Sequence, residues 1–167
     1  MSVTDLPVAT GEKLPGSFHA KQSVRLWLRL LSCSMTVEGA VRSRLRAEFD
    51  TTLPRFDVMA ALERAPDGLT LTALSEHLLV SNGNVTGLVQ RMVQDGLAEK
   101  RAVEGDRRSQ RVRLTRRGRA AFAKMAAAHE GWIEEMFGGL TGREAEQLRG
   151  LLGKLYRTME DTDGERS

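Results

Sequence analysis

The spacing of apolar side chains along the chain predicts a mostly helical protein. From about Ser17 to Phe49, apolar residues recur every three or four positions on two stripes, which predicts one long helix that is apolar on both sides. A second helix is expected to begin near Pro54 and to end before the breaker sequence APDG at 65–68. Because the first of these helices is apolar nearly all round, we expect other helices to pack against both of its sides.

Two shorter helices follow this breaker. The third is predicted from Thr70 to Leu79, and Ser81 is placed to cap a fourth helix that ends at Asp95 and Gly96. The fourth helix carries an apolar stripe at helical spacing, formed by Val85, Leu88, Val89 and Met92. Two short helices separated by a tight turn are typical of a helix-turn-helix.

A β-hairpin is predicted after Gly96. The segments LAEKRAV (97–103) and QRVRLT (110–115) alternate in side-chain type, and EGDRRS (104–109) supplies turn residues. Thr115 then caps a predicted long helix that runs through Met136, and Thr141 with Glu144 forms a capping box for a last helix. The fold class is therefore mainly α with a small β-hairpin wing: helical arms flank a central winged helix-turn-helix domain.

Positive charge is concentrated in and after the hairpin. Residues 100–119 hold nine Lys or Arg against Glu104 and Asp106, a net +7, so the other residues sum to −4 in a chain of net charge +3. A local basic stripe is the footprint of a protein that binds a polyanion such as nucleic acid. A solvated charged loop is the alternative reading of the same run.

The polar side of the fourth helix suits duplex DNA. Amides can bond adenine and an arginine can bond guanine in the major groove, which is wide enough for a helix. Glycines inside a helix cost stability, so Gly83 and Gly87 make sense if the backbone approaches another molecule closely. Outside the buried stripe stand Asn82, Asn84, Thr86, Gly87, Gln90, Arg91 and Gln94.

Several function classes find no support in the sequence. The 167 residues include a lone Cys33, which excludes an intrachain disulfide or a cysteine-paired zinc site, and no metal or cofactor is expected. The chain contains no G-x-S-x-G, H-E-x-x-H or Walker motif, so an enzyme is not expected. No apolar run is long enough to span a membrane or resembles a signal peptide, which favours the cytoplasm.

The sequence resembles the MarR family of winged helix-turn-helix transcription regulators. The resemblance covers Leu53 to Gly118 and is carried by LPRFDVMAAL, LTLTALSEHLLVSNGNVTGLVQRMVQDGLAEKR and EGDRRSQRVRLTRRG. It implies an obligate homodimer with interdigitated terminal helices, recognition helices in successive major grooves and wing tips in minor grooves. It also implies that Arg107 or Arg108 is the minor-groove residue, as suits a guanidinium in a narrow, electronegative groove.

This resemblance leads to an expected function and expected sites. The function is sequence-specific binding of double-stranded DNA at a near-palindromic operator, as a repressor released by a small aromatic carboxylate or its coenzyme A thioester. The DNA-binding residues are expected to be Ser81, Asn82, Asn84, Thr86, Gly87, Gln90, Arg91, Arg107, Arg108 and Arg111. The effector would lie between the dimer helices and the winged domain, near Trp27, Arg29, Phe49, Phe56, Met59, His129 and Trp132, which equally fit a packed core.

Two positions depart from the family pattern. Many relatives have an aspartate that pairs with a wing arginine where this chain has Gln90, and a larger side chain where it has Gly87. Gln90 can therefore bond a base or the wing, and Asp106 can tether an arginine of its own hairpin. Some relatives sense oxidants through a thiol on the first helix, but Cys33 stands among apolar residues and is expected to be buried and structural.

The expected organisation has three parts. Residues 1–16 form a flexible arm, residues 17–52 and 119–167 form the helical dimerisation region, and residues 53–118 form the DNA-binding domain. The rival reading is a winged-helix module that binds RNA or protein and has no effector. RNA recognition usually stacks bases on aromatic rings, and no Phe, Trp or Tyr occurs between Phe56 and Phe122, which favours duplex DNA.

Overall fold

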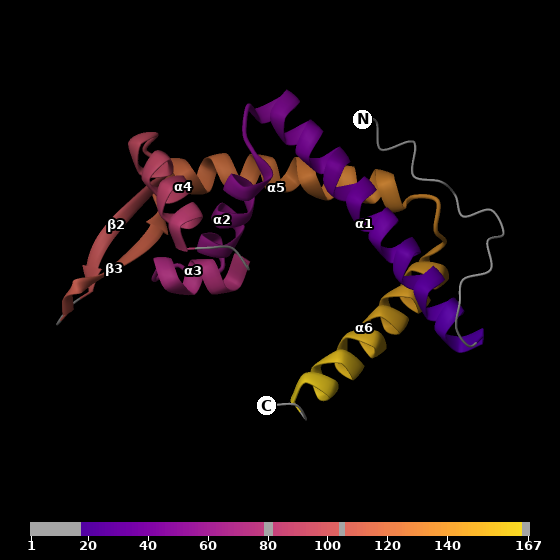
Figure 1. The fold of residues 1–167 in the computed structure, drawn as a ribbon. Coiled ribbons are helices and arrows are strands. Elements are labelled where there is room, and N and C mark those ends of the chain that lie inside the picture. Colours follow the sequence, from indigo (N-terminus) through magenta and orange to yellow (C-terminus); the bar gives the residue numbers. More distant parts are fainter. Residues whose placement is uncertain (1–17, 79–81, 104–105, 165–167) are drawn as a thin grey trace. The chain divides into compact units, whose positions relative to one another are not determined.

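The computed structural model of the chain describes residues 18–78, 82–103 and 106–164. The chain divides into two compact units, Met1–Ala40 and Val41–Ser167, and the long helix α1 (Phe18–Phe49) crosses this division. The elements that follow are α2 (Leu53–Glu63), β1 (Leu69–Thr70), α3 (Leu71–Leu78), α4 (Asn82–Gln94), β2 (Ala98–Val103), β3 (Asp106–Leu114), α5 (Arg116–Phe137) and α6 (Gly142–Gly164) (Figure 1). The predicted fold class, mainly helical with a β-hairpin wing, is confirmed.

The described part of the first unit consists of α1 up to Ala40, and the predicted arm at 1–16 lies outside the described residues. The apolar side chains of this segment are largely exposed: Trp27, for example, is 59% exposed. Cys33 is exposed as well, so the expectation that it is buried was wrong. The two apolar stripes predict burial only if another element covers them, and the described part of this unit contains no such element.

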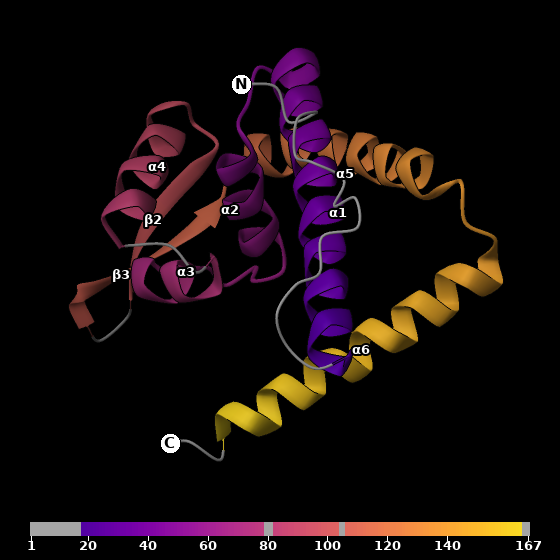
Figure 2. The same ribbon diagram turned by 45° about the vertical axis from the view of Figure 1, so that its right-hand side comes forward.

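The core of the second unit is built from the predicted apolar stripes. Helices α2, α3 and α4 and strand β3 each contribute completely buried side chains, and the last turns of α1 add Leu45. Figure 2 shows α4 running beside β2, with α2 and α3 next to it. The largest of these buried side chains are Leu45, Met59, Leu62, Leu74, Met92, Val58, Val85, Val89 and Val112.

The described strands form one antiparallel sheet in the order β1-β3-β2. Strand β1 was not predicted, because Thr70 was assigned to the third helix. In the structure Thr70 pairs with Arg111 of β3, and its Oγ1 accepts a hydrogen bond from the Ala73 amide at 3.1 Å. Thr70 is thus the last residue of β1 and also caps α3. Its β-branched side chain suits a strand, and its hydroxyl group can accept the hydrogen bond of a helix cap.

The second wing strand, β3, begins earlier and is longer than the sequence predicted. Strand β3 begins at Asp106, so residues 106–109, which were expected in the turn, belong to the strand. The pairing with β2 is irregular between Ala102 and Val103, where Val103 pairs with Asp106. The connection at 104–105 lies outside the described residues. Register, rather than the presence of turn-forming residues, therefore decides where this hairpin turns.

Both predicted caps after the wing are confirmed. Thr115 Oγ1 accepts a hydrogen bond from the Gly118 amide at 3.0 Å at the start of α5. At the start of α6, the Thr141 amide donates to Glu144 Oε2 at 2.8 Å and the Glu144 amide donates to Thr141 Oγ1 at 3.3 Å. These reciprocal bonds satisfy amides that have no partner inside the helix. Within the described chain, no helix is both long and apolar enough to cross a membrane.

Candidate nucleic-acid interface

Helix α4 presents two chemically different sides. Val85, Val89 and Met92 are completely buried, whereas the amide side chains of Asn84 and Gln90 are exposed. Burial of the apolar stripe fixes the rotation of the helix about its axis, because each buried side chain of this kind contributes about 1.5–3 kcal/mol. The polar side is consequently held outward, as the sequence predicts.

The other residues of α4 that are predicted to contact DNA differ in their exposure to solvent. Thr86 and Gly87 are half-buried, and Arg91 is exposed while its Nε donates to the Gly87 carbonyl at 3.3 Å. Asn82 is the first residue of α4, but its side chain lies outside the described part, as does all of Ser81.

The two glycines of α4 have no packing role inside the described chain. A Cβ atom added to Gly83 or to Gly87 would meet no heavy atom within 4 Å. Glycine in a helix interior costs about 1 kcal/mol relative to alanine. The two glycines therefore lower the stability of the helix without allowing closer packing between described elements. That the backbone of α4 approaches another molecule closely at these glycines stays a prediction.

Polar contacts connect the C-terminal end of α4 to α2 and α5. Asp95, directly after the helix, forms an ion pair with Arg55 of α2, and its carbonyl accepts a hydrogen bond from Arg117 Nη1 of α5 at 3.2 Å. Gly96 then takes a φ of +69°, the left-handed conformation expected of a glycine that ends a helix. These contacts hold the end of α4 in position against α2 and α5.

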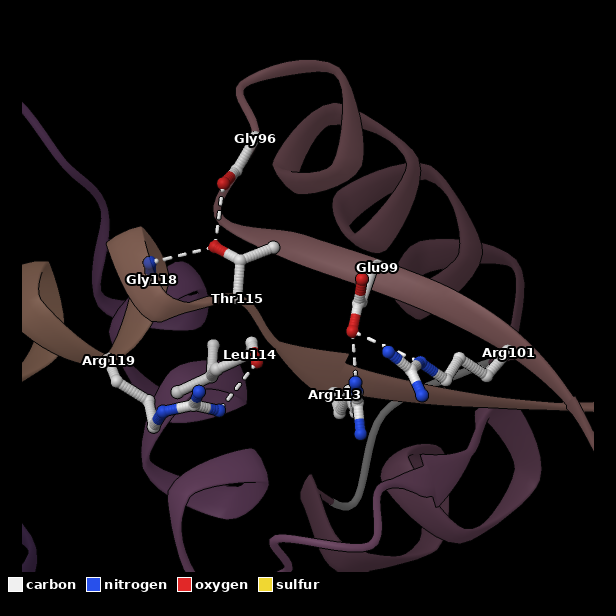
Figure 3. Close-up of polar contacts among 8 residues, drawn as sticks. All are labelled: Gly96, Glu99, Arg101, Arg113, Leu114, Thr115, Gly118 and Arg119. Atoms are coloured by element: carbon white, nitrogen blue, oxygen red, sulfur yellow. Dashed lines mark hydrogen bonds and ion pairs between the residues drawn. The ribbon is translucent and has the colours of Figure 1, made fainter.

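The base of the wing is braced by Glu99, a residue that the sequence analysis did not single out. Glu99 Oε1 lies 2.5 Å from Arg113 Nε and 3.3 Å from Arg101 Nε (Figure 3). The hydrogen bond from Arg113 holds the pKa of the Glu99 carboxyl below its usual value, and the charges of Arg113 and Arg101 act in the same direction. Glu99 and Arg113 are cross-strand partners, so the strand register, once known, would have revealed the pair.

Much of the local positive charge serves the fold. Arg111 Nη1 donates to the Gly68 carbonyl at 2.9 Å and ties β3 to the turn before β1. Arg119 Nη1 donates to the Leu114 carbonyl at 2.8 Å, and Thr115 Oγ1 donates to the Gly96 carbonyl at 2.8 Å (Figure 3). Among the described basic side chains of residues 100–119, therefore, several brace the wing base.

The wing tip is described by its backbone alone. Arg107 and Arg108 lie in strand β3 near its start, and their side chains, like that of Asp106, are outside the described part. Their proposed contact with a minor groove therefore remains a prediction, as does the tether through Asp106.

Comparison with known proteins assigns the chain to a family. The model of the MarR family matches residues 49–109. A MarR family transcriptional regulator from Silicibacter pomeroyi has a crystal structure with 32% sequence identity and a TM-score of 0.74, covering 86% of this chain and 99% of that chain. The chain belongs to the MarR family.

Two further relatives of this MarR-family regulator are informative. The transcriptional activatory protein BadR of Rhodopseudomonas palustris is 35% identical over 104 residues, which are 61% of this chain and 59% of BadR. A mutant MarR from E. coli, crystallised in complex with operator DNA, is similar in fold: it has 23% identity and a TM-score of 0.69, covering 84% of this chain and 99% of that chain. The names of these relatives describe transcription regulators.

Five of the residues predicted to bind the effector lie in the second unit of this MarR-family chain. The rings of Phe56 and His129 are tilted to one another with their centroids 5.1 Å apart, and the ring centroids of Trp132 and Phe49 are 6.1 Å apart. Met59 is completely buried, and both Phe56 and Trp132 are 7% exposed, so these three side chains serve the core. Trp27 and Arg29 lie on the exposed part of α1 in the first unit. The effector role of all seven remains a prediction.

The described part of the second unit of this MarR-family fold contains cavities, of which two are relevant to an effector. One, of about 740 Å³, lies among α2, the end of α4 and the start of α5, and Phe49 and Met59 are in its wall. The other, of about 470 Å³, lies between the end of α1 and α4 and is lined by three arginines, Arg42, Arg46 and Arg91. Both combine apolar walls with cationic groups, which is the composition that a small organic acid requires.

Proposed function

We propose that this MarR-family regulator binds double-stranded DNA in a sequence-specific manner through α4 and the β2–β3 wing. One observation carries the proposal: α4 is buried completely along Val85, Val89 and Met92 and exposes amide and guanidinium groups on its other side. Side chains of these types can bond base edges in the major groove. The rigid attachment of α4 to the core gives them a fixed direction.

The proposed interface divides into base contacts and backbone contacts. Asn84, Gln90 and Arg91 are the proposed base readers of α4. Arg107 and Arg108 at the wing are the proposed minor-groove contacts. Ser81, Asn82, Thr86, Gly87 and Arg111 complete the proposed set, although Arg111 also holds the Gly68 carbonyl. The side chain of Gln90 is exposed on α4, and Glu99 supplies a carboxylate that braces the base of the wing, so a base contact is the role proposed for Gln90.

The protein acts as a homodimer in this proposal. The dimerisation region comprises residues 17–52 and 119–167, and its helices α1 and α6 display apolar side chains such as Trp27 and Leu151, which are 59% and 67% exposed. Such surfaces are stable in water when a second copy covers them. Two-fold symmetry then requires a near-palindromic operator with half-sites about 10 bp apart.

DNA binding is tested by titrating the protein with an operator duplex, a scrambled duplex and a single-stranded RNA of equal length. Competition with genomic fragments first selects the operator. The proposal expects the operator to bind at least about 10³-fold more tightly than the scrambled duplex, and both duplexes to lose affinity as salt rises. Equal affinity for all three, or preference for RNA, would support the rival module that binds RNA or protein.

The proposed regulatory role is repression in the cytoplasm, relieved by a small aromatic carboxylate or its coenzyme A thioester. Support comes from the aromatic groups beside Phe56 and from the cationic cavities. Because BadR is named an activatory protein, the direction of control needs its own test: a reporter gene behind the operator should be silenced by the protein. A thermal-shift screen of aromatic acids identifies the effector, since a ligand of the folded state raises the melting temperature.

A further inference from the structure

The cavity between the end of α1 and α4 is strongly basic. Three arginines line its volume of about 470 Å³: Arg42 and Arg46 from the last turns of α1 and Arg91 from α4. Among the described residues of the lining, Asp57 of α2 carries the negative charge, so two positive charges are in excess. Like charges gathered around one space repel one another, and an anion between them lowers the electrostatic energy. The cavity therefore favours an anionic partner.

The arginines of this cavity combine a fixed backbone with exposed side chains. Arg42 and Arg46 are four positions apart, so they lie on one face of α1. Their neighbours Val41 and Leu45 are buried in the core of the second unit, which holds this end of α1 in place. Arg42, Arg46 and Arg91 are themselves exposed. Guanidinium groups presented in this way suit the oxygen atoms of phosphate groups.

The same cavity borders the proposed base-reading side of α4. Asn84, Leu88 and Arg91 line it, and their spacing of four and three positions places them on one stripe of the helix. Asn84 is exposed and is one of the proposed base readers. A helix is about 10–12 Å across and the major groove is about 12 Å wide, so the flank of an inserted helix faces the phosphates of the groove wall. A strand of DNA bound by α4 would therefore pass this cavity.

The N-terminus of α2 contributes to the same lining. Thr51, Thr52, Leu53 and Pro54 all border the cavity. Thr52 is the N-cap residue, and its exposed side chain makes no capping hydrogen bond within the described chain. The N-terminal end of a helix carries a partial positive charge that attracts phosphate groups. The field of α2 therefore acts in the same direction as the arginines.

We infer that Arg42 and Arg46 bind phosphates of the operator backbone at this cavity, beside the bases that Asn84 contacts. The inference rests on the proposed function, because it requires that α4 enters a major groove. A small organic acid would match the same charge, but the lining extends from the arginines to Asn84, which favours a phosphate of the DNA that Asn84 reads. Such a contact fixes the position of α4 on the duplex and carries no sequence information of its own.

Duplex titration of the full chain at several salt concentrations tests the contact. Replacing Arg42 and Arg46 together by Gln should weaken operator and scrambled duplex by a similar factor, roughly tenfold, and should reduce the salt slope by about 0.9 for each lost phosphate contact. Replacing both by Lys keeps the charges and should keep most of the slope. Arg64→Gln, at the other end of α2 and outside the cavity lining, is the matched control and should change neither quantity. An unchanged slope in the Gln double variant would overturn the inference.

Uncharged phosphates separate a direct contact from long-range attraction. Operator duplexes are prepared with one methylphosphonate, a neutral phosphate analogue, at each position of a half-site in turn. The wild-type protein should lose affinity several-fold at phosphates next to the bases that Asn84 contacts. At one or two of these positions the Gln double variant of Arg42 and Arg46 should lose no further affinity, because the interaction is already absent. A double variant as sensitive as the wild type at every position would refute the direct contact.

The outcome for this cavity is separable from that of the proposed function. If the wild-type chain fails to bind duplex DNA, the proposed function is wrong and the phosphate contact falls with it. If the wild type binds the operator and the Gln double variant binds equally well, the phosphate contact alone is wrong. The contact is also overturned if the double variant keeps DNA binding but loses a rise in melting temperature caused by benzoate, since the cavity then holds a small acid. Circular dichroism melting curves confirm that each variant is folded before it is titrated.

Discussion

Glu99 and Arg113 face each other across the wing, with Oε1 and Nε 2.5 Å apart and the two residues in register on β2 and β3. Arg101 approaches the same carboxylate from two positions along β2. One acidic side chain therefore gathers two arginines of the basic stretch at the base of the wing. Arg101 and Arg113 therefore stabilise the base of the wing, whereas Arg107 and Arg108 lie nearer its tip.

The bracing by Glu99 should depend on pH in a defined direction. Hydrogen bonding from Arg113 lowers the pKa of Glu99 in the folded chain, so its stabilising contribution is complete above the ordinary pKa and is lost as the pH falls through the lowered value. Glu99→Gln should reduce the hydrogen-exchange protection of the β2 and β3 amides at neutral pH and should remove this acid-side loss. An unchanged pH profile in Glu99→Gln, with Glu130→Gln as control, would contradict the bracing role.

Gly118 should tolerate no side chain. A Cβ at this position would lie 1.9 Å from the Leu97 carbonyl oxygen, so α5 would have to move away from the start of the wing. Gly118→Ala should lower the free energy of unfolding by about 3 kcal/mol, as overpacking does. Gly131→Ala on the same helix, where nothing lies within 4 Å, should raise it by up to about 1 kcal/mol. Urea unfolding measures both, and similar effects would contradict the close approach.

Gly87 should show opposite effects on stability and on binding. The space around it is open, so Gly87→Ala should stabilise the fold by about 1 kcal/mol. If DNA approaches the backbone there, the same variant should weaken operator binding. Thermal melting measures the change in stability, and titration of the same preparation with the operator duplex measures the change in affinity. Improved stability with unchanged affinity would show that the glycine does not serve DNA contact.

The wing tip and α4 should divide the work of recognition. Replacing Arg107 and Arg108 together by Ala should weaken operator and scrambled duplex alike, and should reduce the salt slope by about 0.9 for each lost phosphate contact. Asn84→Ala or Gln90→Ala should instead weaken the free energy of operator binding by about 1–3 kcal/mol and should change the binding of scrambled DNA little. Titrations at several salt concentrations measure both. A wing variant that loses operator binding alone would make these arginines base readers.

The apolar surface of α6 should be required for dimer formation. Light scattering of the dilute protein should give the mass of a dimer. Leu151→Glu places a charge at a side chain that is 67% exposed in the single chain, so it should favour the monomer without disturbing the core. Lys154→Glu on the same exposed helix is the control for added negative charge. A wild-type monomer, or a dimer unaffected by Leu151→Glu, would rule out this interface.

Local pattern alone was sufficient to predict most of the elements. The stripe from Val85 to Met92, the glycine at 96 and the caps at Thr115 and Thr141 depend on residues within a few positions of one another, and all appear in the structure. Periodicity and capping act over one or two helical turns, so they can be read without knowledge of the fold. The outward direction of Asn84 and Gln90 follows from the same stripe.

Tertiary structure decided how the charges are used and where the chain turns. The partners of Arg55, Arg113 and Arg111 lie 40, 14 and 43 residues away in sequence, and composition cannot tell a bracing arginine from a DNA-contacting one. The same holds for strand β1 and the early start of β3, which depend on register, and for exposed Cys33, whose burial requires a covering element. The sequence determined the helices and their polar faces because those patterns are local, whereas the ion pairs and strand register arise only when distant segments meet.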